Sequence, residues 1–87
     1  MKLPYIENKY YRIYTNKRGM RVLQTNKKIL ADAIRFTTEA YVHKFNNPDG
    51  SITYSFEWSE RLQEIAEELV KLHEESLKLK NEQKFDE

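Results

Sequence analysis

The sequence of 87 residues contains no cysteine, which excludes disulfide scaffolds, thiolate zinc sites and cysteine nucleophiles. One hypothesis is a small toxin-like ribonuclease that cleaves RNA by general acid–base catalysis. Its candidate residues are His43, Lys44, Tyr54 and Arg12. The other histidine, His73, has no histidine or carboxylate partner at metal-ligand spacing. Neither a glycine-rich phosphate loop nor an activated-serine motif occurs. We therefore expect a protein that is not an enzyme and that uses no cofactor and no metal.

Basic and aromatic side chains alternate near the start of the chain. Residues 9–15 and 20–25 have the composition of strands, and the turn between them ends at Gly19. If Thr15 pairs with Met20, one strand face carries both kinds of side chain. The candidate contacts to nucleic acid or to an acidic partner are Tyr10, Arg12, Tyr14, Lys17, Arg18 and Arg21. The alternative is a solvated face on which tyrosine and arginine only pack together.

One stretch of the chain resembles part of the amino-terminal arm-binding domain of tyrosine integrases. It is KYYRIYTNKRGMRVLQTNKKILADA, at residues 9–33. In that domain, strands with basic and aromatic residues precede a helix that opens with a Thr-Lys-Lys-like run. The resemblance covers less than a third of the chain, and the third strand of that domain has no place before Asn26. We therefore do not assign the chain to that family.

A long acidic helix is predicted at residues 60–81, with Ser59 as its N-cap. Five apolar residues fall at heptad positions, and Ser76 interrupts the pattern: Leu62, Ile65, Leu69, Leu72 and Leu79. Such a helix spans about 33 Å, which is about the width of a domain of this size, so its distal turns project. Leu72, Leu77 and Leu79 would then pair with a second copy or with a partner protein. The alternative is an ordinary amphipathic helix with a soluble acidic face.

The remaining pattern predicts a second hairpin and a short helix. Residues 51–58 alternate strictly between apolar and polar side chains, and a Pro-Asp-Gly turn precedes them. With Asn46 paired to Ser51, His43 lies on the buried aromatic face. The short helix is capped by Asn26 and ends near Phe36.

The chain is thus predicted to be a single small α+β domain over residues 1–87, with the order ββαββα and an antiparallel sheet covered by helices. Residues 1–8 form a lead-in and residues 82–87 a frayed tail. The inner face of the sheet is expected to hold Ile13, Val22, Tyr41, Phe45, Ile52, Tyr54 and Phe56. Leu30, Ile34, Leu62, Ile65 and Leu69 are expected to cover it, and Trp58 to anchor the last helix.

The formal net charge of +1 conceals two opposite halves. Residues 1–45 carry ten basic and three acidic side chains, a sum of +7, and residues 46–87 carry five and eleven, a sum of −6. This split predicts a charged partner on at least one side. The alternative is that the two halves neutralise each other within the fold.

Binding is the function class that these observations favour. No secretory leader and no apolar run of about 20 residues occurs, so we expect a cytoplasmic protein. Phe, Tyr, Ile, Asn and Lys, which have AT-rich codons, total 32 residues against 13 for Gly, Ala, Arg and Pro, so the composition predicts a low-GC genome. A very short chain rich in Lys and Asn, with no visible active site, is typical of a phage or mobile element. We expect a small binding protein that inhibits or modulates a host protein, or a nucleic-acid-handling or defence complex, by occupying its surface. The alternative is a DNA- or RNA-binding module that uses the hairpin at 9–25. A homodimer through the last helix is a further expectation.

Overall fold

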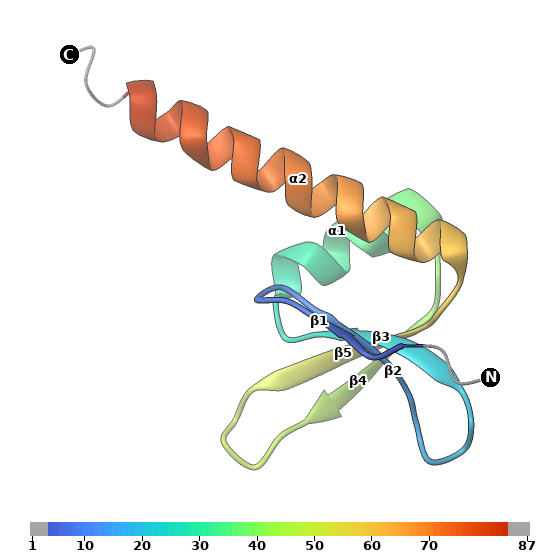
Figure 1. Cartoon of the computed structure of the whole chain (residues 1–87). Coiled ribbons are helices and arrows are strands. Elements are labelled where there is room, and N and C mark those ends of the chain that lie inside the picture. Colours follow the sequence, from blue (N-terminus) through green and yellow to red (C-terminus); the bar gives the residue numbers. More distant parts are fainter. Residues whose placement is uncertain (1–3, 84–87) are drawn as a thin grey trace.

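The computed structural model describes residues 4–83, and it has an α+β fold with a five-stranded antiparallel sheet and two helices (Figure 1). The elements are, in chain order, β1 (Ile6–Glu7), β2 (Arg12–Thr15), β3 (Arg21–Thr25), α1 (Lys28–Thr38), β4 (Val42–Asn46), β5 (Ile52–Glu57) and α2 (Glu60–Gln83). The predicted ββαββα order is confirmed. The short strand β1 precedes it, within the predicted lead-in.

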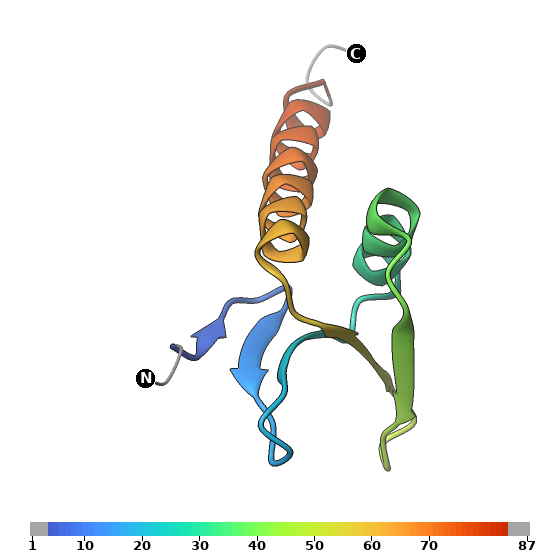
Figure 2. The same ribbon diagram turned by 90° about the vertical axis from the view of Figure 1, so that its right-hand side faces the viewer.

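The strands follow the order β1-β2-β3-β5-β4, and α1 and α2 both lie on the same side of the sheet (Figure 2). One row of side chains crosses the whole sheet on that side because the register pairs Ile6, Ile13, Leu23, Phe56 and Val42 in turn. Ile13, Leu23 and Phe56 are fully buried. The helices complete the core mainly with Leu30, Ala31, Ile34, Leu62 and Ala66. The other face of the sheet is covered by neither helix.

Both hairpins pair one residue away from the predicted register. The predicted pairing of Thr15 with Met20 is wrong, because Thr15 pairs with Arg21. In the first turn, the Gly19 N–H donates to the Asn16 carbonyl at 2.9 Å, and the Asn16 N–H donates to the Met20 carbonyl at 2.8 Å. Gly19 and Met20 therefore oppose Asn16 together, and Gly19 has φ of 82°. This is the arrangement of a G1 bulge, whose extra residue shifts the register by one.

The second turn is built in the same way. The Gly50 N–H donates to Asn47, whose own N–H donates to Ser51, and Gly50 has φ of 91°. Asn46 therefore pairs with Ile52 instead of Ser51. A shift of one residue moves every side chain of a strand to the other face.

The shift overturns part of the predicted inner face. Tyr41 and Phe45 are 75% and 51% exposed, so their predicted burial is wrong. Val22 is buried but lies on the face away from the helices, since its neighbour Leu23 points toward them. Tyr11 belongs to the core although it is absent from the predicted list.

The two hairpins are structural repeats of each other. Asn47 and Gly50 take the places of Asn16 and Gly19, and both hairpins have the same turn and the same register. The two repeats meet between β3 and β5, where Gln24 pairs with its own counterpart, Ser55. The sheet therefore has approximate two-fold symmetry about this pair.

The first helix starts and ends later than predicted. Asn26 is not its N-cap, because Lys27 occupies that position without a side-chain cap. The Thr25 hydroxyl accepts the Lys27 N–H at 3.1 Å instead. At the other end, Thr37 and Thr38 are both helical, and their hydroxyls each donate to a carbonyl one turn back, at 2.7 Å.

The last helix is close to the prediction. Ser59 caps it, since its hydroxyl accepts the Leu62 N–H at 3.1 Å. Trp58 joins sheet and helix, because its ring N–H donates to the Gln63 side chain at 2.8 Å and its backbone N–H donates to the Arg21 carbonyl. Helix α2 continues to Gln83, and the rest of the predicted tail, residues 84–87, lies outside the described residues. Among the described helices, none has the length and apolar character needed to cross a membrane.

Candidate nucleic-acid interface

The face of the sheet that the helices leave open carries a line of polar side chains across five strands. The register places Glu7, Arg12, Gln24, Ser55 and His43 side by side in that order. At its centre the Gln24 amide donates to the Ser55 hydroxyl at 3.4 Å. We call this surface the open face. It is where β2, β3, β4 and β5 present their outward side chains.

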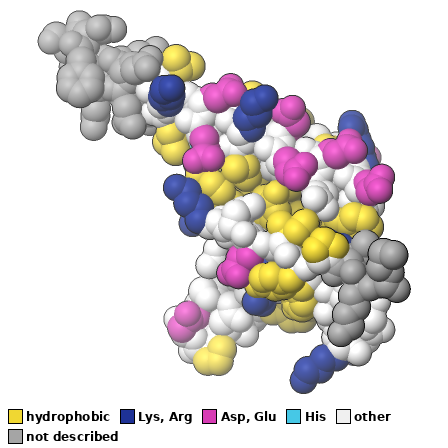
Figure 3. Space-filling view, viewed as in Figure 1, with side chains coloured by type: hydrophobic (Ala, Val, Ile, Leu, Met, Phe, Trp, Pro, Cys, Tyr) yellow, Lys and Arg dark blue, Asp and Glu magenta, His cyan; other side chains and the backbone are white. Residues whose placement is uncertain are grey.

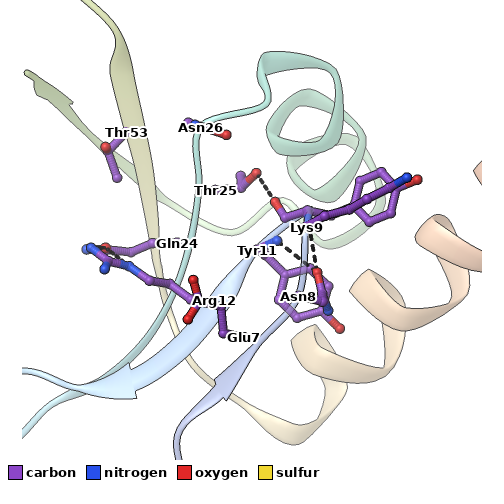
Figure 4. Close-up of a pocket in the computed structure, with 10 residues that line it drawn as sticks. Glu7, Asn8, Lys9, Tyr11, Arg12, Gln24, Thr25, Asn26 and Thr53 are labelled. Carbon is purple, nitrogen blue, oxygen red and sulfur yellow. Dashed lines mark hydrogen bonds between the residues drawn. The ribbon is translucent and has the colours of Figure 1, made fainter. Parts of the chain in front are cut away.

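Arg12 is held in place at one end of the open face. Its Nε and Nη2 atoms donate to the side-chain oxygen Oε1 of Gln24 at 3.2 and 2.9 Å, and its guanidinium lies 5.0 Å from the centre of the Tyr14 ring. A pocket of about 400 Å³ adjoins it, lined by Glu7 to Arg12, Gln24 to Asn26 and Thr53 (Figure 4). Figure 4 shows Arg12 and Gln24 reaching toward each other from β2 and β3. A fixed arginine beside an aromatic ring and an open pocket can contact a phosphate and a base together.

A row of exposed rings lies at the other end of the open face. Tyr41, His43 and Phe45 alternate along the edge strand β4 and its first flanking residue, so they point to the same side. The Tyr41 and His43 rings meet edge to face, with their centres 4.7 Å apart. The His43 and Phe45 rings are stacked, with their centres 6.5 Å apart. We call these three residues the aromatic row. Exposed rings on a sheet are platforms on which unpaired bases stack.

The approximate two-fold symmetry relates the two ends of the open face. Arg12 and Tyr14 on β2 correspond to His43 and Phe45 on β4, as the shared turn and register show. Three strand spacings separate β2 from β4, or about 14 Å. Each end thus presents one nitrogen-rich side chain beside one ring.

The turn between β2 and β3 carries two further cations. Lys17 and Arg18 are exposed at its tip, as predicted. The Asn16 side chain accepts the N–H groups of Arg18 and Met20, each at 3.0 Å, which orders the turn beneath them. In the second turn, Asp49 occupies the position that corresponds to Arg18 in the first turn. The Ser51 hydroxyl and N–H donate to its carboxylate at 2.7 and 2.9 Å and hold the Asp49 pKa below its usual value of 3.8.

Two of the predicted site residues do not lie on the open face. Tyr10 is buried on the helix side, and its ring meets the His73 ring edge to face at 5.8 Å. Arg21 also points to the helix side, where its guanidinium lies 5.1 Å from the centre of the Trp58 ring. Its Nε and Nη1 atoms are buried without a hydrogen-bond partner among the described residues. The bulge shift explains Arg21, and both side chains are structural rather than available to a ligand.

The four residues of the ribonuclease hypothesis are not brought together. His43 and Arg12 lie on the open face at opposite ends. Lys44 and Tyr54 pair with each other on the helix side, and Tyr54 is buried. Over residues 4–79, whose side chains the structure describes, no cluster of three or more histidine, aspartate or glutamate side chains could hold a metal ion.

The predicted leucines of the last helix are exposed. Leu72, Leu77 and Leu79 are 56%, 46% and 59% accessible. Leu72 lies across from α1, and the C-terminal part of α2 extends past α1 (Figure 1). Acidic side chains are spread along α2, and hydrophobic side chains lie along its lower side (Figure 3). The acidic helix α2 and the open face therefore lie on different sides of the sheet (Figure 2).

Sequence reasoning missed the aromatic row because it placed these rings in the core. The signal that would have found them is the Asn-x-x-Gly pattern shared by both turns, with glycine as the bulge residue. Comparison with known proteins adds no assignment, since no family model, curated protein or solved structure matches the chain.

Proposed function

We propose that the protein binds single-stranded nucleic acid on its open face. The observation that carries the proposal is the aromatic row, with Tyr41 and Phe45 largely exposed on a sheet surface that neither helix covers. Bases stack on such rings without a need for a particular sequence, because every base has a π face. A duplex hides those faces, so unpaired strands are the favoured ligand.

The charges of the open face support a backbone contact at its other end. Arg12 faces outward beside Tyr14, and Lys17 and Arg18 extend from the adjoining turn. Two carboxylates, Glu7 and Glu57, share the face. The attraction for phosphate therefore comes mainly from Arg12 and the turn, while the acidic helix α2 repels phosphate from the opposite side of the molecule.

The proposal is tested by fluorescence anisotropy with labelled single-stranded DNA, single-stranded RNA and a duplex of the same sequence. We expect saturable binding of the single strands, weaker binding of the duplex, and an affinity that falls as salt increases. Arg12→Glu should weaken binding, whereas the same charge reversal on α1, Arg35→Glu, should not. Absence of binding at low salt would refute the proposal. A preference for the duplex would refute the stacking mechanism.

Binding to a host protein, a phage or mobile-element source, and a cytoplasmic location remain predictions. The first is tested by capture from a nuclease-treated host lysate, in which a specific protein retained by the wild type is the expected result. The ribonuclease hypothesis is tested by RNA cleavage that disappears in His43→Ala. The separation of its four residues over two faces of the sheet argues against it.

A further inference from the structure

A groove of about 530 Å³ runs between the first turns of α1 and the middle of α2. Its apolar walls are Ile29, Leu30 and Ala33 from α1, and Leu69, Val70 and Leu72 from α2. Ile29 is 80% exposed and Leu72 is 56% exposed, so much of the groove is open to solvent. This groove lies on the helix side and is separate from the open face.

Helix α2 continues beyond the groove with nothing against it in the described part of the chain. Helix α1 has 11 residues and α2 has 24, so their lengths are about 16 and 36 Å. Every side chain from residue 71 to 79 is exposed, although Leu72, His73 and Ser76 also line the groove. Leu62 and Ile65 are buried, and Leu62 and Leu69 pack in the core. Leu72 and Leu79 continue this series at heptad spacing, with Ser76 at the position between them. Exposed leucines at heptad spacing are typical of a helix that packs against another helix.

The charges around these two surfaces are complementary. Glu68 and Glu75 are exposed and flank Leu72 and Leu79, because residues three and four apart are neighbours on a helix. The groove is bordered instead by Lys27 and Lys28, and α1 has no acidic residue in its first turn. Lys28 already pairs with Asp32 at 2.7 Å. Lys27 takes part in neither of the ion pairs found in the described part of the chain, so it is the cation at the groove that can pair with a partner.

We propose that a second copy of this chain occupies the groove. The distal part of α2, residues 71–79, lies in the groove of the other copy, and the arrangement is reciprocal about a two-fold axis. Leu72 and Leu79 of one copy then cover Ile29 and Ala33 of the other, with Glu75 near Lys27. Because each copy offers the same helix and the same groove, the contact closes at two copies. This dimer is independent of the proposed nucleic-acid function.

The test is analytical ultracentrifugation of the full chain over a wide range of concentration. We expect a reversible dimer for the wild type. Leu72→Glu combined with Leu79→Glu should weaken dimerisation at least about 100-fold, because four buried leucines per dimer are lost. The control Lys78→Glu adds negative charge on the opposite side of the same helix and should leave the dimer intact. A wild type that stays monomeric at all concentrations, or a leucine double variant that still dimerises, would overturn the proposal.

A charge exchange tests which surfaces meet, even if the leucine variant folds poorly. Lys27→Glu and Glu75→Lys should each weaken the homodimer because each places like charges together. An equimolar mixture of the two variants should recover association as a mixed dimer through one restored pair and one reversed pair. If both variants dimerise as the wild type does, or if mixing them does not restore dimerisation, the second copy does not bind in the groove. A specific heterologous protein in place of the second copy would also contradict the proposal.

Discussion

Truncation of the aromatic row should weaken the binding of single-stranded nucleic acid while changing the stability of the fold little. Tyr41 and Phe45 are 75% and 51% exposed, and they lie on the edge strand β4. Their replacement by alanine removes the ring contacts with His43, at 4.7 and 6.5 Å, and leaves no buried cavity. We therefore expect each single variant to lower the free energy of unfolding by less than about 1 kcal/mol.

The effect on binding should be much larger. Stacking of one base on an aromatic side chain contributes about 1–3 kcal/mol, and each 1.36 kcal/mol is a factor of ten in affinity. Phe45→Ala should therefore raise the dissociation constant for single-stranded nucleic acid about 5- to 150-fold. Tyr41→Ala should have an effect of the same order. The assay is fluorescence anisotropy at constant salt, with a thermal melt of each variant measured beside it.

The matched control is Phe36→Ala. Phe36 is 90% exposed and lies on α1, on the helix side, so its truncation removes a still more accessible ring from a surface outside the open face. Its affinity should equal that of the wild type. If Phe36→Ala weakens binding as much as Phe45→Ala, or if neither row variant weakens it, base stacking on the open face is refuted.

Three further outcomes follow from the same geometry. Arg21→Ala should lower the free energy of unfolding by about 0.5–2 kcal/mol through loss of its contact with Trp58, measured by urea denaturation, and should leave nucleic-acid affinity unchanged. The Asp49 pKa is lowered by the Ser51 hydroxyl and N–H, so this carboxylate stabilises the turn fully above its ordinary value of 3.8, and the stabilisation is lost as pH falls through the lower folded value. An NMR titration should give its midpoint below 3.8, and a midpoint at or above 3.8 contradicts this. Ser59→Ala removes the cap of α2 and should cost about 1 kcal/mol in the same denaturation assay.

The element order could be predicted from the sequence because each signal is local. Glycine at 19 and 50 marks both turns, Ser59 caps α2, and alternation marks β5. The faces of β3 and β4 could not be predicted as easily. They depend on whether a turn contains a bulge, and the difference is a single residue with no change in the apolar pattern.

The one-residue difference in register affected the prediction of the candidate site most. The shift of register moved Arg21 to the helix side and brought His43 and Phe45 to the open face. The burial of Tyr10 depends on its contact with His73, which lies far away in the sequence. The third strand before α1 was missed because β1 has only two residues, too few for a periodic pattern.

The most direct measurement of the central claim is NMR of the aromatic and methyl groups during titration with a single-stranded oligonucleotide. We predict saturable shift changes for the rings of Tyr14, Tyr41 and Phe45 on the open face. The methyl groups of Ile29 and Leu72, in the groove between the helices, should not change at the same protein concentration. The account would be contradicted if saturable shift changes were confined to Ile29 and Leu72. It would also be contradicted if the signals of the three rings did not shift when the protein is saturated with oligonucleotide.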